Sequence, residues 1–83
     1  MLLQDPKADT TIFSSNLSIL ISRKEVTEEK ICTDLDAQLP RLQSWLKGHC
    51  FPKYSMMVKI CNYFEYYDIY KLITQPIQVV STA

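Results

Sequence analysis

The chain has 83 residues and almost no glycine, since Gly48 is the single one. Phosphate-binding loops of nucleotide-using enzymes need several glycines in a short segment, so that class of site is excluded. The single histidine, His49, lies directly beside Cys50, and adjacent residues do not form a nucleophile and base pair without special geometry. We therefore expect neither an enzyme nor a cofactor.

Cysteine is also scarce, with three residues at irregular spacing: Cys32, Cys50 and Cys61. An odd number without a repeated spacing argues against a disulfide framework and fits a reducing compartment. The paired cysteine or histidine spacings of zinc sites are missing, so we expect no metal. Cys32 and Cys61 fall on apolar faces of expected helices, where cysteine behaves as a small hydrophobic residue. Cys50 is expected to be exposed.

Long apolar runs are missing too, and none approaches the ~20 residues of a membrane span. The opening "MLLQDPKADTT" has an acid and a proline where a signal peptide needs an apolar core. We therefore expect a cytoplasmic protein without a membrane anchor. Nine basic and nine acidic residues cancel, so only the distribution of charge can support binding to nucleic acid.

What the chain does have is a composition typical of one folded domain and apolar residues at helical spacing. A first helix is expected after Ser14 or Ser15 as N-cap. A second should follow Thr27, with acids in its first turn, where the helix dipole favours them. Asp36 then suits a left-handed turn position. The apolar faces of these two helices are Phe13, Leu17, Leu20 and Ile21, and Ile31, Cys32 and Leu35.

The segment "LPRLQSWLKG" predicts a third helix that begins near Gln38 and ends at Gly48. Pro40 is tolerated because first-turn amides have no intrahelical partner. A fourth helix is expected from Tyr54 to Phe64, and a fifth between Asp68 and Pro76. The apolar face of the third is Leu39, Leu42, Trp45 and Leu46, and that of the fourth Tyr54, Met57, Val58, Cys61 and Phe64.

The expected fold class is therefore all-α. Residues 1–12 are expected to form a flexible N-terminal arm, residues 13–73 the helical domain, and residues 74–83 a C-terminal tail. The tail "IQVVSTA" is either frayed or a short strand that pairs across a dimer.

Two short helices joined by a tight turn, the second ending in a tryptophan and a glycine, form a helix-turn-helix pattern. From Asn16 to Phe64 the chain resembles, without a gap, the Cro/phage-repressor (Xre-type) family of helix-turn-helix domains. The resemblance implies a compact five-helix lambda-repressor-like domain, and a bacterial or phage transcriptional regulator such as a repressor. The matching residues are Asn16, Leu17, Leu20, Thr27, Ile31, Cys32, Leu35, Leu42, Trp45, Gly48, Pro52, Met57, Lys59, Ile60, Cys61 and Phe64.

The resemblance also implies that the third helix enters the major groove of double-stranded DNA. Paired hydrogen bonds allow arginine to read guanine and glutamine to read adenine. The residues expected at base edges are Arg41, Gln43 and Ser44, with Pro40 in the same helix, and those expected at the backbone are Gln38, Lys47, His49 and Lys53. An ordinary amphipathic helix with a solvated face is the open alternative.

A palindromic operator is expected to bind a homodimer, formed through Ile69, Tyr70, Ile73 and the tail. A second hypothesis rests on departures from the family pattern. Glu28 stands where a phosphate-binding glutamine is common, Leu39 and Pro40 replace small polar residues, and Leu46 and Ile21 replace a frequent acid and base. On this reading the same fold is a protein-interaction module or antirepressor, and its exposed leucines contact a protein partner.

Overall fold

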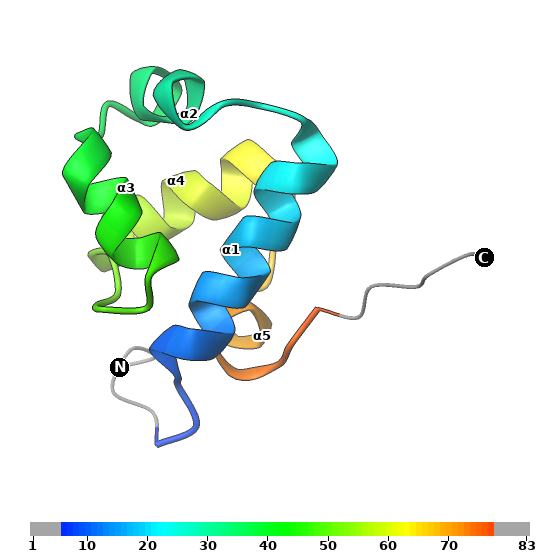
Figure 1. Ribbon diagram of the computed structural model, residues 1–83. Helices are drawn as coiled ribbons and strands as arrows, with labels where there is room; N and C mark the ends of the chain where they lie inside the picture. Colours follow the sequence, from blue (N-terminus) through cyan, green and yellow to red (C-terminus); the bar gives the residue numbers. More distant parts are fainter. Residues whose placement is uncertain (1–5, 78–83) are drawn as a thin grey trace.

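The computed structural model describes residues 6–77, which contain five helices and no strand. This confirms the predicted all-α class and the number of helices. The possible strand in the tail lies mostly outside the described residues. The helices are α1 (Thr10–Lys24), α2 (Glu28–Leu35), α3 (Leu39–Leu46), α4 (Tyr54–Phe64) and α5 (Ile69–Thr74), and Figure 1 shows their arrangement.

The start of α1 differs from the prediction. Asp9, not Ser14 or Ser15, is the N-cap, and its carboxylate accepts a hydrogen bond from the Thr11 amide at 2.7 Å. The Asp9 amide in turn donates to the carbonyl of Ile73 at 3.0 Å, which ties this end of α1 to α5. Residues 10–12, assigned to the flexible arm, are therefore helical. The apolar pattern begins at Phe13, but the capping residue lies one turn earlier.

Left-handed residues follow four of the helices. Asp36 (φ 54°) and Gly48 (φ 75°) confirm the predicted ends of α2 and α3, and Glu25 and Glu65 (both φ 56°) follow α1 and α4. After α3, the His49 amide donates a hydrogen bond of 3.0 Å to the Ser44 carbonyl. This is the pairing by which a left-handed residue satisfies carbonyls at a helix end.

The core combines residues from all five helices, and most of the predicted inner faces are confirmed. Tyr54 is an exception, since it is 53% exposed, whereas Ile60, which the predicted face of α4 did not include, is fully buried. Leu42 and Trp45 of α3 are 1% and 4% exposed. Ile73 is fully buried, so it is a core residue, and its assignment to a dimer contact is wrong. The buried hydrophobic residues are Phe13, Leu17, Leu20, Ile31, Leu35, Leu42, Trp45, Met57, Ile60, Cys61, Leu72 and Ile73.

Asn16 is a buried polar side chain inside this core. Its Nδ2 donates to the carbonyls of Leu72 at 2.8 Å and Gln75 at 2.9 Å, and its Oδ1 accepts from the Ile77 amide at 2.8 Å. All three contacts lie at the end of α5. A single side chain of α1 thus satisfies one of the carbonyls that the end of α5 leaves without partners, together with two backbone groups just beyond the helix.

Contacts between helices place α2 and α3 side by side, α1 against α3 and α5, and α4 against α2 and α5. In Figure 1, α2 and α3 lie at one side of the molecule, and α5 lies below α1. Among the described residues, no helix is both long enough and apolar enough to cross a membrane.

Candidate nucleic-acid interface

Helix α3 presents a polar outer face because Leu42 and Trp45 fix its inner face in the core. Pro40, Arg41, Gln43 and Lys47 are exposed, whereas Ser44 is half-buried. With ~100° between successive helical residues, Pro40, Ser44 and Lys47 lie at the centre of the outer face. Arg41 and Gln43 lie on opposite flanks. The prediction that these side chains point away from the core holds in full for four of the five.

The first turn of α3 has no capping side chain. Gln38 is the N-cap residue, but its side chain makes no cap hydrogen bond, and Pro40 occupies the second helical position. First-turn amides have no acceptor inside a helix. Helix α3 therefore owes its place to the burial of its apolar face, not to local capping.

The loop after α3 is anchored to the core. Phe51 packs against Phe13, with ring centroids 5.9 Å apart, and Pro52 is buried. These contacts hold Lys53, the N-cap residue of α4, whose side chain also makes no cap hydrogen bond. Tyr54, the first residue of α4, is 53% exposed. The beginnings of α3 and α4 thus both carry exposed side chains and uncapped first turns.

A shallow pocket of about 290 Å³ lies between the α2–α3 turn, α3 and the start of α4. It brings together three of the predicted site residues, Gln38, Arg41 and Lys53. Gln43, Lys47 and His49 do not line it. The full lining is Asp36, Ala37, Gln38, Arg41, Trp45, Lys53, Ser55 and Met56.

The polar side chains of this face are uncommitted. Within residues 6–77, their side chains make no hydrogen bond or ion pair with the rest of the protein. They are Gln38, Arg41, Gln43, Ser44, Lys47, His49 and Lys53. Exposed polar side chains ordinarily bond to water. Because no internal contact holds these groups, a ligand can replace that water.

The charge distribution shows a basic segment that the balanced total conceals. Residues 37–64 contain four basic residues (Arg41, Lys47, Lys53 and Lys59) and no acid, for a formal charge of +4. Residues 25–36 contain five acids (Glu25, Glu28, Glu29, Asp34 and Asp36) and Lys30, for a formal charge of −4. Counting charge by segment finds this signal in the sequence, whereas the net charge of zero hides it.

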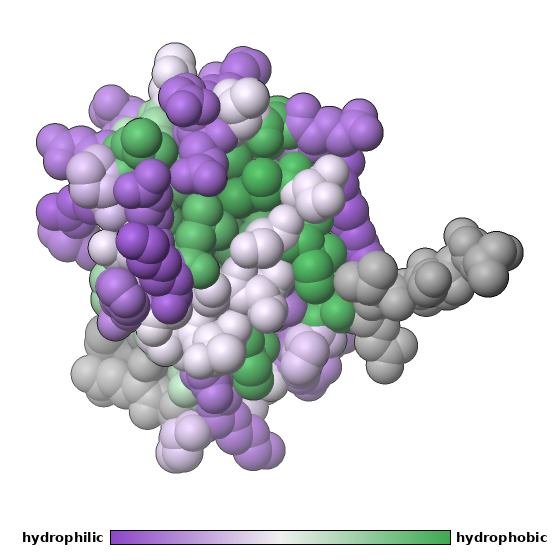
Figure 2. Space-filling model, viewed as in Figure 1, coloured by the Kyte–Doolittle hydropathy of each residue, from purple (hydrophilic) through white to green (hydrophobic). Residues whose placement is uncertain are grey.

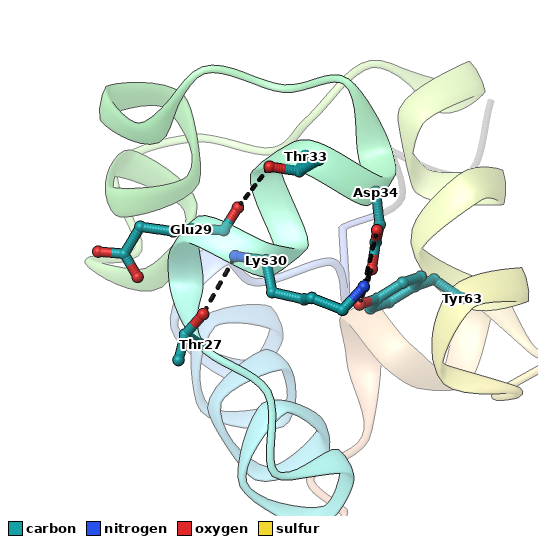
Figure 3. Close-up of polar contacts among 6 residues, drawn as sticks. All are labelled: Thr27, Glu29, Lys30, Thr33, Asp34 and Tyr63. Carbon is teal, nitrogen blue, oxygen red and sulfur yellow. Dashed lines mark hydrogen bonds and ion pairs between the residues drawn. The ribbon is translucent and has the colours of Figure 1, made fainter.

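Helix α2 commits its polar groups internally, as Figure 3 shows. The Thr27 hydroxyl accepts from the Lys30 amide at 3.1 Å, and the Lys30 ammonium lies 3.1 Å from the Asp34 carboxylate. Asp34 also accepts a hydrogen bond of 2.6 Å from the Tyr63 hydroxyl of α4. The Glu29 carboxylate points away from these contacts in the figure.

The contact with Tyr63 affects how both partners titrate. Hydrogen bonds from Tyr63 and then Lys30 lower the pKa of Asp34 below its usual value. Burial, followed by the hydrogen bond to Asp34, raises the pKa of Tyr63 to about 12. The Lys24 ammonium lies 4.8 Å from the Tyr63 ring centroid, so α1 joins the same cluster. Around neutral pH the charged carboxylate and the neutral phenol are both favoured.

The next question is whether the described residues could bind a metal ion or offer a reactive cysteine thiol. Among the described residues, no three histidine, cysteine or acidic side chains are grouped so as to hold a metal ion. Cys61 is buried, and burial raises the pKa of its thiol to about 11, which keeps it neutral and unreactive. Cys50 is exposed, as predicted.

Hydrophobic side chains near α3 contribute to packing. Leu39, Leu46 and Ile21 are half-buried and pack against the core, so the two leucines expose only part of their surface. Figure 2 shows hydrophobic surface in the centre of the face on which α1, α2 and α3 lie, with hydrophilic side chains around it. Leu39, Leu46 and Ile21 thus extend the core, whereas Pro40 stays exposed.

No protein-family model, no curated protein and no solved structure matches this chain.

Proposed function

We propose that the protein is a sequence-specific double-stranded DNA-binding transcriptional regulator with a lambda-repressor-like helix-turn-helix fold. One observation carries the proposal: α3 and the start of α4 contain basic residues and no acid, and the polar side chains of this face have no partner within residues 6–77. Asp36, from the preceding turn, is the one acid that lines the adjoining pocket. Uncommitted basic and amide side chains on an exposed helix suit the phosphates and base edges of a duplex.

In the proposed complex, α3 lies in the major groove with its outer face toward the bases. Arg41 and Gln43, on opposite flanks, then approach base edges that differ in position along the groove. Arginine pairs with guanine and glutamine with adenine. The half-buried Ser44 reaches less far, so Arg41 and Gln43 carry most of the direct base recognition.

In this proposal, the pocket at the start of α4 binds phosphate. Lys53 and the first turn of α4 line this pocket together with Asp36, and an anion is favoured at the N-terminus of a helix. Gln38 on the opposite wall adds an amide donor. Lys47 and His49 extend the basic face beyond the pocket.

A homodimer on a palindromic operator remains part of the proposal. Ile73 is not available for it, but the nearby Ile69 and Tyr70 are half-buried and Tyr67 is 74% exposed. Aromatic residues are enriched at protein interfaces. Two reading helices ~34 Å apart would then contact successive major grooves.

The proposal is tested by titration of a duplex selected from a random library, at several salt concentrations. Counterion release requires that log K fall linearly with log salt, and three or four phosphate contacts give a slope of about −3. Arg41→Ala should weaken the selected duplex by about 1–3 kcal/mol and relax specificity at one position. Lys71→Ala, on α5, is the matched control. Absence of duplex binding even at low salt contradicts the proposal.

A protein-interaction module is the second candidate function, and the acidity of α2 favours it. Glu28 and Glu29 lie in the first turn of α2, next to the reading helix, where they repel phosphates. If the protein binds DNA, Glu28→Gln should strengthen binding by about two- to fivefold at low salt, and less at high salt. If it acts only on proteins, the substitution leaves duplex binding undetectable.

A further inference from the structure

Pro40 is the exposed apolar group at the start of the outer face of α3. It occupies one of the first two helical positions and has neither an amide hydrogen nor a polar side-chain atom. The preceding Leu39 is half-buried and packs against the core. Helical geometry places Pro40, Ser44 and Lys47 within roughly 60° of one another around the axis. The pyrrolidine ring therefore lies in the centre of this face.

The position of the ring restricts what it can contact in a major groove. N-terminal residues of a reading helix contact base edges. Those edges carry hydrogen-bond donors and acceptors, and the one apolar group among them is the C5-methyl of thymine. A carbon ring placed over a donor or acceptor removes its water and returns no hydrogen bond, which is unfavourable. Against a methyl group the same ring buries apolar surface.

We infer that Pro40 is a specificity-determining residue that selects thymine at one position of each half-site, through contact with the C5-methyl group. The inference rests on the proposed DNA-binding function and deepens it. Arg41, Gln43 and Ser44 offer hydrogen bonds to guanine, adenine or either, whereas Pro40 offers none. The recognised half-site is thus expected to combine hydrogen-bonded bases with one thymine read by its methyl group alone.

The first test leaves the protein unchanged. In a duplex recovered by random-library selection, each thymine is replaced in turn by uracil, which lacks only the methyl group. One replacement per half-site should weaken binding by about fourfold, the contribution of one buried methyl group, and the others should have no effect. If every replacement leaves the affinity unchanged, no methyl group is read and the inference is wrong.

The second test assigns the contact to Pro40. With Pro40→Ser, the thymine and uracil duplexes should bind equally well, because the ring is gone. With Pro6→Ser, which alters an exposed proline before α1, the fourfold difference should persist. Circular dichroism and thermal unfolding verify that both variants are folded. A fourfold difference that survives in Pro40→Ser assigns the methyl contact to another residue and overturns the inference.

These outcomes separate the inference from the proposed function. If the library yields no duplex, DNA binding itself fails, and the inference fails with it. If a duplex is recovered with a salt-dependent affinity but without any effect of uracil, DNA binding stands and the role of Pro40 does not. Loss of the uracil effect in Pro40→Ser alone supports both.

Discussion

Helices α2 and α3 have the same length, eight residues, and pack against each other, yet they differ in the local contacts that stabilise them. Helix α2 has a side-chain cap, an ion pair one turn apart and acids in its first turn. Helix α3 has none of these in the described structure and carries a proline in its first turn. Both helices bury two hydrophobic side chains, Ile31 and Leu35 in α2 and Leu42 and Trp45 in α3, but only α2 adds local polar contacts to this burial.

The difference bears on the role proposed for α3 in DNA recognition. A helix held by its buried face has no need to use its exposed polar groups for itself, and those groups stay available to a ligand. Helix α2 uses Thr27, Lys30 and Asp34 internally and keeps a negative surface. One helix therefore serves as support and the other as the candidate reading element. The predictions below test this division, from the largest expected effect to the smallest.

Removal of the buried anchor of α3 should have the largest effect. Trp45→Ala is expected to lower the free energy of unfolding by about 3–5 kcal/mol, because it removes a large buried side chain and leaves a cavity. Urea denaturation followed by circular dichroism measures the change. Tyr67→Ala, at a 74% exposed aromatic residue, is the control and should stay within about 0.5 kcal/mol of wild type. Equal effects of the two substitutions would refute the dependence of α3 on Trp45.

The capping residues of the two helices should respond differently. Thr27→Ala removes the cap of α2 and should destabilise the protein by about 1 kcal/mol. Gln38→Ala should have little effect because Gln38 caps nothing, and Gln38→Ser should stabilise α3 by about 0.5–1 kcal/mol. Thermal unfolding of the three variants makes the comparison. A loss with Gln38→Ala as large as with Thr27→Ala would contradict the contrast.

The left-handed residues after the two helices offer a matched pair of substitutions. Asp36→Gly should stabilise the protein by about 1 kcal/mol, since glycine relieves the strain of φ 54°. Gly48→Ala should destabilise it by about 1 kcal/mol because of φ 75°. Crowding is a minor factor, as an added Cβ would lie 3.5 Å from the Thr10 carbonyl oxygen. Both changes are measured by urea denaturation, and effects of the same sign would contradict this account.

The smallest effect is expected in the dependence of the free energy of unfolding on pH, at acidic pH. The lowered pKa of Asp34 means that its contribution to stability is present above the ordinary aspartate pKa of about 3.9, and is lost as the pH falls through the folded-state value. Asp34→Asn should therefore lie closest to wild type at the lowest pH. Urea denaturation between neutral and strongly acidic pH measures the difference.

Tyr63→Phe is the companion variant, because it removes the hydrogen bond that lowers the Asp34 pKa most. In this background Asp34→Asn should have a weaker dependence on pH. If the pH dependence is the same with and without the Tyr63 hydroxyl, the hydrogen bond is not its cause.

Local sequence was informative wherever the controlling contacts are local. The inner face of α3, the Thr27 cap, and the left-handed positions of Asp36 and Gly48 depend on neighbours within one or two turns, and all were predicted. The start of α1 was not predicted, since Asp9 is fixed partly by the hydrogen bond that its backbone amide donates to the carbonyl of Ile73. Helical periodicity over the six residues of α5 was also too short to show that Ile73 faces inward.

The sequence by itself determined the number of helices, most of the inner faces of α1 to α4 and the separation of acidic from basic segments, because helical periodicity and capping act over a few residues. Only the tertiary structure decided which groups meet. It placed Asn16 on the end of α5, 56 residues away from Leu72, and the Lys53 end of α4 beside Arg41. Such contacts depend on how the apolar faces pack together in three dimensions, and no local pattern encodes that packing.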